Sequence, residues 1–142
     1  MTAQVLVVVS IVLDQGRRIH GMSSAITVAA LIGCVLPALS EYRMSLLSLG
    51  ILGAVIAVGV IELWFAIRVS IDAALFRRLA RVPDWRTLDE ALINLGMIPV
   101  EKTGQPEAVR IAGARRLLRF QAVALIAQIG LAVILAVIGA TK

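Results

Sequence analysis

The sequence predicts an all-α fold, a polytopic helical integral membrane protein that forms a single membrane domain over residues 1–142. Two properties of the composition predict it, because 60% of the residues are hydrophobic and only 16% are charged. Soluble domains contain roughly 45–50% apolar and about 25% charged residues. A globule of this length cannot bury so much apolar surface, which excludes an ordinary soluble enzyme. A disordered chain would need the opposite composition.

The third observation is that the apolar residues form three runs long enough to cross a bilayer. Residues 22–39 and 120–140 contain no charged side chain, and residues 45–67 contain only Glu62. A transmembrane helix needs about 20 residues at 1.5 Å per residue, and roughly 17–25 residues are workable. Every backbone polar group in lipid must be satisfied within its own segment. The three runs are therefore predicted to be transmembrane helices.

Residues 2–19 are predicted to form a fourth, membrane-embedded helix at the N-terminus. Their apolar part, residues 2–13, would be only about 18 Å long as a helix. The embedded part reaches Ile19 if Arg17 and Arg18 extend to the membrane surface. An interfacial or re-entrant segment is the alternative. A cleaved signal peptide is disfavoured, because the basic start and the small-residue cleavage site are missing.

The basic residues predict the orientation of the chain. Lys and Arg concentrate in the connection 68–119 and also occur in residues 14–20, whereas residues 40–44 are neutral overall. Connections rich in Lys and Arg remain in the cytoplasm. We therefore expect a multi-pass protein of the inner (plasma) membrane with residues 68–119 cytoplasmic. The N-terminus lies outside if residues 2–19 span the membrane and inside if they do not.

The cytoplasmic connection, residues 70–119, is predicted to be largely helical. Apolar residues at helical spacing continue the 45–67 helix as far as Arg81. Pro106 suits the first position of the last helix. That helix then runs without a strong breaker through the 120–140 span, for roughly 35 residues or 50 Å.

A short helix is predicted between these two long ones. Thr87 and Glu90 have the spacing of a capping box, in which each side chain accepts a hydrogen bond from the other residue's backbone amide. Gly96 follows the apolar edge of this segment, where a helix often ends in a left-handed residue. The segment from Thr87 to Gly96 is therefore expected to be an ordered helix within the connection.

Small residues recur at four-residue spacing on all three predicted spans. Such rows let helix backbones approach closely, since lipid provides no hydrophobic force for association. Rows on three helices indicate a surface for self-association or for a larger partner. Gln128, deep in the last span, is expected to hydrogen-bond to a neighbouring helix. The predicted helix-packing residues are Ala29, Gly33, Gly50, Gly53, Ala57, Gln128, Ala132 and Ala136.

A candidate intramembrane polar site consists of Glu62, Gln121 and Gln128. A carboxylate inside a membrane is unfavourable unless it is paired or neutral. Glu62 is interpreted either as a group that handles protons or ions, or as a structural carboxylate near the membrane surface. In the structural case it bonds to water, to lipid headgroups at the level of Trp64 or to a basic side chain of another helix, for which Arg116 or Arg119 of the last helix is the more plausible choice. The structural interpretation is favoured for Glu62, and helix packing is favoured for the two glutamines, because a stripe that lines a pore would need more polar residues than two.

The basic helix ends are predicted to contact anionic lipid headgroups, an attraction of about 1 kcal/mol per charge near the surface. No aromatic residues alternate with them, so nucleic acid is not expected as a partner. The residues concerned are Arg77, Arg78, Arg81, Arg115, Arg116 and Arg119.

Motifs for chemistry are missing from the sequence. It contains no glycine-rich phosphate loop, no HExxH, no GxSxG and no paired carboxylates. His20 is the only histidine and Cys34 the only cysteine, too few for a haem or zinc site within one chain. We therefore expect no catalytic residue, no cofactor, no metal site and no small-molecule substrate.

These observations lead to a functional expectation. The chain is expected to be a non-catalytic accessory or assembly subunit of a bacterial-type inner-membrane protein complex. Its partners would be membrane lipid and either other integral membrane subunits or further copies of itself. The alternative is a homo-oligomeric channel or small transporter with Glu62, Gln121 and Gln128 on its polar path.

Overall fold

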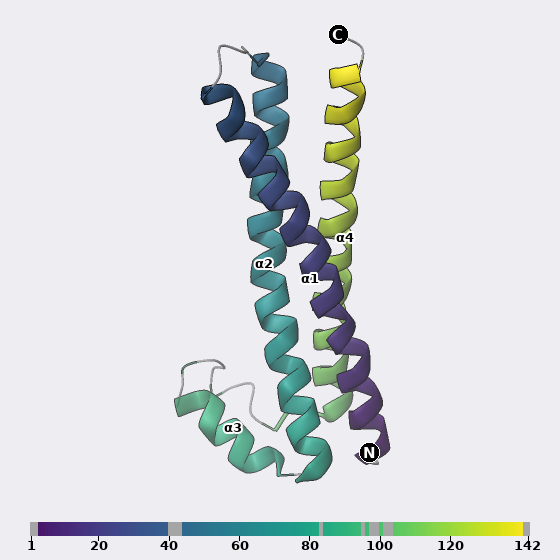
Figure 1. Ribbon diagram of the computed structural model, residues 1–142. Helices are drawn as coiled ribbons and strands as arrows, with labels where there is room; N and C mark the ends of the chain where they lie inside the picture. The colour runs from purple at the N-terminus through teal and green to yellow at the C-terminus, as the bar shows by residue number, and fades with distance from the viewer. Residues whose placement is uncertain are drawn as a thin grey trace.

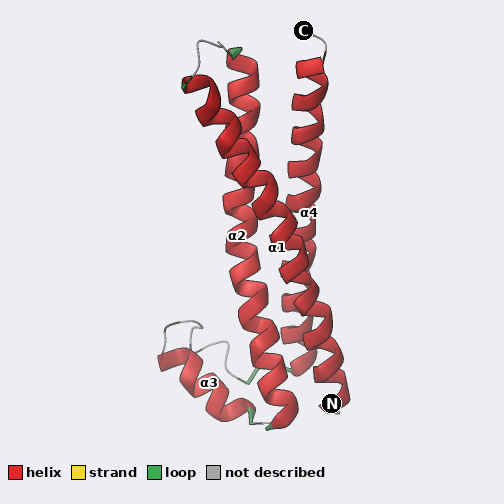
Figure 2. Ribbon diagram, viewed as in Figure 1, coloured by secondary structure: helices red, strands yellow, loops and turns green. Residues whose placement is uncertain are grey.

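The computed structural model describes residues 3–39, 44–82, 84–94, 96, 100 and 104–140. Three long helices form a bundle, and a short helix lies to one side of one of its ends (Figure 1). The described residues contain helices and connections but no strand (Figure 2). The helices are α1 (Ala3–Ala38), α2 (Leu46–Arg81), α3 (Trp85–Asn94) and α4 (Glu107–Ala140). Helices α1 and α4 run parallel, and α2 runs antiparallel to both.

Among the described residues, the three long helices are each long enough and apolar enough to cross a membrane. Helices α1 and α2 have 36 residues each and α4 has 34, so each is about 50 Å long. The hydrocarbon core of a bilayer is about 30 Å thick. The bundle is therefore longer than a single crossing requires. The predicted extension of the 45–67 helix to Arg81 and the long last helix are both confirmed.

The N-terminal segment requires a correction. Residues 2–19 were predicted as a separate fourth helix, but the described part of this segment and the predicted span 22–39 form one helix, α1. The break was expected because residues 14–20 are polar. In the structure these polar residues lie mainly on the outside of the bundle, while Leu13 and Gly16 are buried. The helix therefore continues without interruption.

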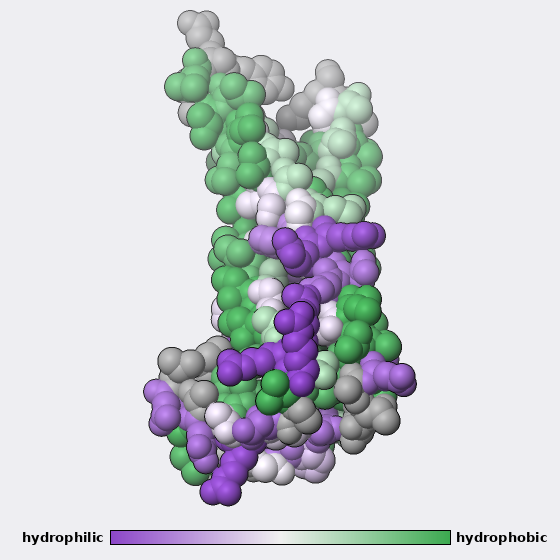
Figure 3. Space-filling model, turned by 60° about the horizontal axis from the view of Figure 1, so that its bottom comes forward, coloured by the Kyte–Doolittle hydropathy of each residue, from purple (hydrophilic) through white to green (hydrophobic). Residues whose placement is uncertain are grey.

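The two ends of the bundle differ in polarity. The charge-free segments lie toward the end that holds the C-terminus. The other end, called the charged end here, consists of α1 before residue 19, α2 after residue 67, α3, and α4 before residue 120. Figure 3 shows hydrophilic side chains gathered over this end and apolar side chains toward the other.

Two apolar clusters make up the core and leave a polar layer between them. The cluster at the charged end joins all three long helices, and the second cluster lies toward the opposite end. The first contains Leu6, Leu13, Val69, Ala73, Phe76, Leu79 and Ala114, and the second contains Ala30, Leu52 and Val55.

The start of α3 corrects the predicted capping box. Asp84 caps the helix, because its Oδ1 accepts a hydrogen bond from the Thr87 amide (3.1 Å) and its Oδ2 accepts one from the Thr87 hydroxyl (2.6 Å). Thr87 is therefore the third residue of the helix rather than its cap, since Asp is the stronger acceptor and lies one turn earlier. Gly96 has a φ of 66°, as its predicted left-handed position requires.

A buried ion pair fastens α3 to α4. The Arg110 guanidinium donates two hydrogen bonds of 2.7 Å to the two carboxylate oxygens of Asp89, and the Gly104 amide donates a third of 3.1 Å. Trp85 adds a hydrogen bond from Nε1 to Oε1 of Glu107 (2.7 Å). The hydrogen bonds from Arg110 hold the pKa of Asp89 below its ordinary value.

Acid is expected to release α3 from the bundle. Because the pKa of Asp89 is lower in the folded state than in the unfolded chain, its stabilisation is present above about pH 3.9 and is lost as the pH falls through the folded-state value. Asp84, whose pKa is lowered by its hydrogen bonds with Thr87, acts in the same direction. Fluorescence of Trp85 in a Trp64→Phe variant, recorded from pH 7 down to pH 2, measures the release.

A matched pair of variants tests the assignment to Asp89. Asp89→Asn should show the released fluorescence already at pH 7, because the ion pair with Arg110 is gone. Glu90→Gln removes an exposed carboxylate from the same helix and should behave like the parent. Identical fluorescence in the two variants would contradict the role of Asp89.

Candidate functional site

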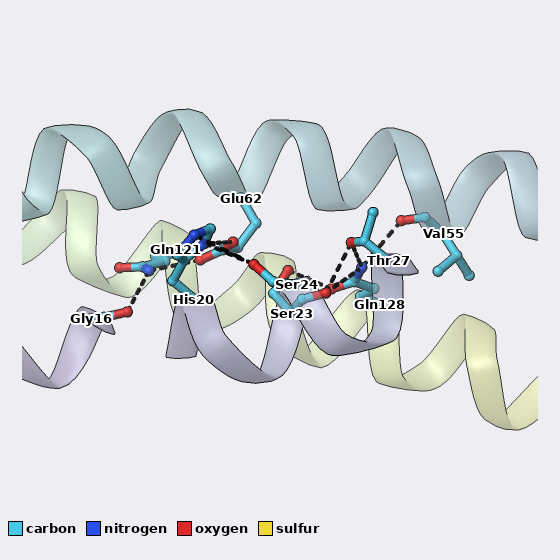
Figure 4. Close-up of polar contacts among 9 residues, drawn as sticks. All are labelled: Gly16, His20, Ser23, Ser24, Thr27, Val55, Glu62, Gln121 and Gln128. Carbon is cyan, nitrogen blue, oxygen red and sulfur yellow. Dashed lines mark hydrogen bonds and ion pairs between the residues drawn. The ribbon is translucent and has the colours of Figure 1, made fainter. Parts of the chain in front are cut away.

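The polar layer in the middle of the bundle holds the most completely buried polar side chains (Figure 4). Glu62 of α2 is 1% exposed, and Gln121 and Gln128 of α4 are fully buried. All three belong to the polar site predicted from the sequence. The structure divides them into two groups, one around Glu62 and one around Gln128, which lie one after the other along the bundle.

The first group joins all three long helices through Glu62. Its Oε2 lies 3.0 Å from Nδ1 of His20 on α1. Its Oε1 accepts a hydrogen bond of 2.7 Å from Nε2 of Gln121 on α4. The same Nε2 also donates to the backbone carbonyl of Gly16 (2.8 Å). The carboxylate is thus held by one imidazole and one amide, each from a different helix.

The second group surrounds the Gln128 side chain. Its Oε1 accepts a hydrogen bond of 2.7 Å from the Ser23 hydroxyl. Its Nε2 donates to the Thr27 hydroxyl (2.8 Å) and reaches the carbonyls of Ser23 and Val55 at 3.3 Å each. The prediction that Gln128 hydrogen-bonds to a neighbouring helix is therefore matched by contacts with both α1 and α2.

The partner predicted for Glu62 is wrong. Arg116 and Arg119 were expected, but both lie exposed at the charged end, and the Arg116 guanidinium lies 5.2 Å from the centre of the Phe120 ring. His20 takes their place. Its position was assigned to a polar connection, although His20, Ser23 and Thr27 share one helix face at spacings of three and four residues. That spacing was the available signal.

Two glycines let the helices approach at the polar layer. A Cβ atom at Gly59 would lie 2.1 Å from Oγ1 of Thr27 and 3.0 Å from Nε2 of Gln128. A Cβ atom at Gly16 would lie 2.8 Å from Oε1 of Gln121. Neither glycine was among the predicted packing residues. The hydrogen bonds of both groups therefore depend on positions that carry no side chain.

The predicted helix-packing residues fall into two sets. Inside the bundle, Gln128 is buried, Ala132 is half-buried, and Gly33 lies against Leu52. The remaining five are exposed on the outer surface of this single chain and make no part of its core. These are Ala29, Gly50, Gly53, Ala57 and Ala136.

Two members of the polar layer are partly exposed, His20 in the Glu62 group and Thr27 in the Gln128 group. His20 lines a shallow cavity of about 210 Å³ between α1 and α2, together with Asp14, Arg17 and Ser70. Toward the opposite end, the apolar cluster around Leu52 follows directly on the Gln128 group. The charged end is closed by the other apolar cluster. The layer therefore does not form a continuous polar path along the bundle.

One polar atom of the layer has no hydrogen-bond partner. Oε1 of Gln121 is the single buried side-chain atom of this kind among the described residues. Both donors of the Gln121 amide point to Glu62 and Gly16, which turns the oxygen toward apolar side chains near Val69. No group of three His, Cys, Asp or Glu side chains that could hold a metal ion occurs in the described ranges.

The six arginines predicted to contact lipid headgroups are all exposed and all belong to the charged end. Arg77 forms an ion pair with Asp14 of α1. Together the six make that end basic on both α2 and α4. They are Arg77, Arg78, Arg81, Arg115, Arg116 and Arg119.

Comparison with known proteins gives no relative for this chain, since no protein-family model, no curated protein and no solved structure matches it.

Proposed function

We propose that the chain is a non-catalytic accessory or assembly subunit of a protein complex in a bacterial-type inner membrane, with residues 68–119 in the cytoplasm. The observation that carries this proposal is an apolar face on α1 at the charged end. Val7, Val8, Ile11 and Val12 are all exposed there, Val8 at 58% and Ile11 at 55%. We call these four residues the α1 apolar face.

The surroundings of this face support a position outside the lipid in the proposed orientation, in place of the membrane-embedded helix predicted for residues 2–19. Residues 3–13 of α1 pack against the parts of α2 and α4 that belong to the charged end, as their shared apolar cluster requires. Those parts carry most of the arginines of the chain. A contiguous apolar surface in water indicates a binding site for another protein. The α1 apolar face therefore supports docking of a partner in the cytoplasm.

The span supports a second contact with a partner. Gly50, Gly53 and Ala57 lie exposed on α2, and the glycines have open space around them. Small residues at this spacing allow a helix of another chain to pack closely within the bilayer. The buried polar side chains, in contrast, are occupied by contacts within the chain. The surfaces left over suit assembly with other subunits.

The alternative of a homo-oligomeric channel or small transporter has less support. Glu62, Gln121 and Gln128 would have to line a polar path. Their hydrogen bonds are directed to other helices of the same chain, and apolar clusters follow the layer on both sides. We therefore assign these residues to helix packing.

Charged residues on the α1 apolar face are expected to release the chain from its complex. The double variant Val8→Glu/Ile11→Glu should leave the thermal unfolding of the bundle nearly unchanged, because both side chains are exposed. Native gels after gentle extraction, with mass spectrometry of co-migrating proteins, should show the wild type with foreign subunits in fixed ratio and the variant without them.

Val109→Glu is the matched control, since Val109 is a similarly exposed valine at the charged end, on α4. It should keep the complex intact. Loss of the complex in both variants would point to charge alone, and retention in both would contradict docking through the α1 apolar face. A wild type that migrates as a homo-oligomer without foreign subunits would contradict the accessory role.

A further inference from the structure

A groove of about 540 Å³ lies between α2 and α4 at the charged end, and α3 closes its far end. Its volume falls within the roughly 300–1,000 Å³ that small-molecule sites occupy. Aromatic and leucine side chains provide most of its lining. Both tryptophans of the chain take part, Trp64 of α2 at one end and Trp85 of α3 at the other.

The groove begins where the charge-free segments end. Trp64 lies in the last turn of the 45–67 segment, and Phe120 opens the 120–140 segment, so the two aromatic residues line the groove at the same level of the bundle. Aromatic residues concentrate at the headgroup level of a membrane. The groove is therefore open to the bilayer surface at this end and extends from there toward α3.

Charged groups flank the opening in an arrangement that matches a phospholipid headgroup. The Arg116 guanidinium, which lines the groove, lies over the Phe120 ring, and the Arg68 guanidinium lies 5.0 Å from the centre of the Trp64 ring. No carboxylate of the described chain forms an ion pair with either arginine. Asp72 lines the same groove, where burial raises its pKa to about 6 while the charge of Arg68 opposes the rise, so its carboxyl is mostly ionised at pH 7.

From this apolar lining and these charges we infer that the groove binds a phospholipid with an amine in its headgroup, such as phosphatidylethanolamine. One acyl chain lies in the groove toward Trp85. The phosphate lies at Arg116, whose guanidinium geometry suits a phosphate, and the ammonium group lies at Asp72. This binding differs from the general attraction of basic helix ends for anionic membranes, because it requires the groove. It is independent of the proposed accessory role.

The end of the groove at α3 is held in place, which explains why an acyl chain suits the groove better than a whole helix of another protein. The ion pair of Asp89 with Arg110 and the hydrogen bond between Trp85 and Glu107 hold α3 against α4. The Arg110 guanidinium also lies 5.1 Å from the centre of the Trp85 ring. Since a helix is about 10 Å wide with its side chains, a groove of about 540 Å³ would hold less than about two turns of one.

Bromine-labelled phosphatidylethanolamine tests the inference, since bromine on an acyl chain quenches nearby tryptophan. In a Trp64→Phe variant, Trp85 is the remaining tryptophan and lies outside the charge-free segments. Titration of this lipid, with bromine near the middle of one acyl chain, into purified protein in detergent should quench Trp85 with a saturable curve. The same titration with labelled phosphatidylglycerol should need a higher concentration, because that headgroup has no amine for Asp72.

Filling the groove should abolish this quenching. Gly113 lines the groove and has open space where a Cβ atom would lie, so Gly113→Phe places a ring inside the groove without displacing a neighbour at Cβ. Gly130→Phe is the matched control on the same helix, because Gly130 also has open space but does not line the groove. Its titration curve should equal that of the parent.

A second pair of variants tests the headgroup position. Arg116→Gln should raise the half-saturating lipid concentration about five-fold, as expected for one charge at the membrane surface. Arg115→Gln, an exposed neighbour that does not line the groove, should change it little. Equal quenching in Gly113→Phe and Gly130→Phe, or equal shifts in the two arginine variants, would overturn the inference. A parent dimer that Gly113→Phe converts to a monomer would also overturn it, because a second copy would then occupy the groove.

Discussion

Gly59→Leu is expected to separate α1 from α2 and to lower the free energy of unfolding by about 3 kcal/mol. The leucine Cβ would lie 2.1 Å from Oγ1 of Thr27 and 3.0 Å from Nε2 of Gln128, so the side chain has no space between the helices. Moving α1 away would also break the hydrogen bonds that Gln128 makes with Ser23 and Thr27. Unfolding in mixed micelles of increasing SDS content, followed by circular dichroism, measures the change.

Gly53→Leu is the matched control for this substitution. Gly53 lies on the same helix within the same span, but it is exposed and has open space around it. We expect its unfolding curve to match the wild type, while its assembly with other subunits is lost. Equal destabilisation by the two leucines would contradict the role of Gly59 as the close-contact point of the bundle.

Glu62→Ala should have the second largest effect, a loss of about 2 kcal/mol or more in the free energy of unfolding. It removes the acceptor for Gln121 and the partner of His20 and leaves a void where three helices meet. Glu62→Gln should restore most of the stability. Its amide oxygen can accept from Gln121, and its amide nitrogen can donate to the imidazole. The same SDS titration measures both variants.

The Glu62 pair also separates the two functional interpretations. A structural carboxylate predicts that wild type and Glu62→Gln give the same proton and ion flux in liposomes. Wild-type flux that Glu62→Gln changes would favour the channel or transporter. An equal loss of stability in Glu62→Ala and Glu62→Gln would show that the negative charge itself, rather than the hydrogen-bonding shape, holds the layer together.

Much of the fold followed from the sequence because composition and helical spacing act locally. The continuation of α2 to Arg81 and the length of α4 could be predicted, because each requires only a run of helix-forming residues without a breaker. The capping of α3 was misassigned, since Asp84 and Thr87 both suit an N-cap and only the geometry selects between them. The continuity of α1 was missed because polar residues interrupt its apolar run, and a helix tolerates them wherever they face outward.

The candidate site was predictable in its members but not in its contacts. Glu62, Gln121 and Gln128 stood out, because polar groups are rare in apolar spans. Their partners could not be chosen before the relative positions of three helices were known. His20 could be recognised as the partner of Glu62 only once α1 was known to be one continuous helix. The sequence does not single out Gly59, because a glycine in a span gives the same pattern whether it faces a neighbouring helix or lipid.

The pairing of α4 with α1 fixes the register in which the two helices meet. Gln121 bonds to Gly16 and Gln128 bonds to Ser23, and each pair is separated by 105 positions in the chain. Two parallel helices could otherwise slip by one heptad, about 10.5 Å, with little change in apolar packing. A slip of that size would place one glutamine against Ala30 or Val9, inside an apolar cluster, with its amide unsatisfied. Two amides one heptad apart thus exclude both neighbouring registers, which purely apolar faces would leave open.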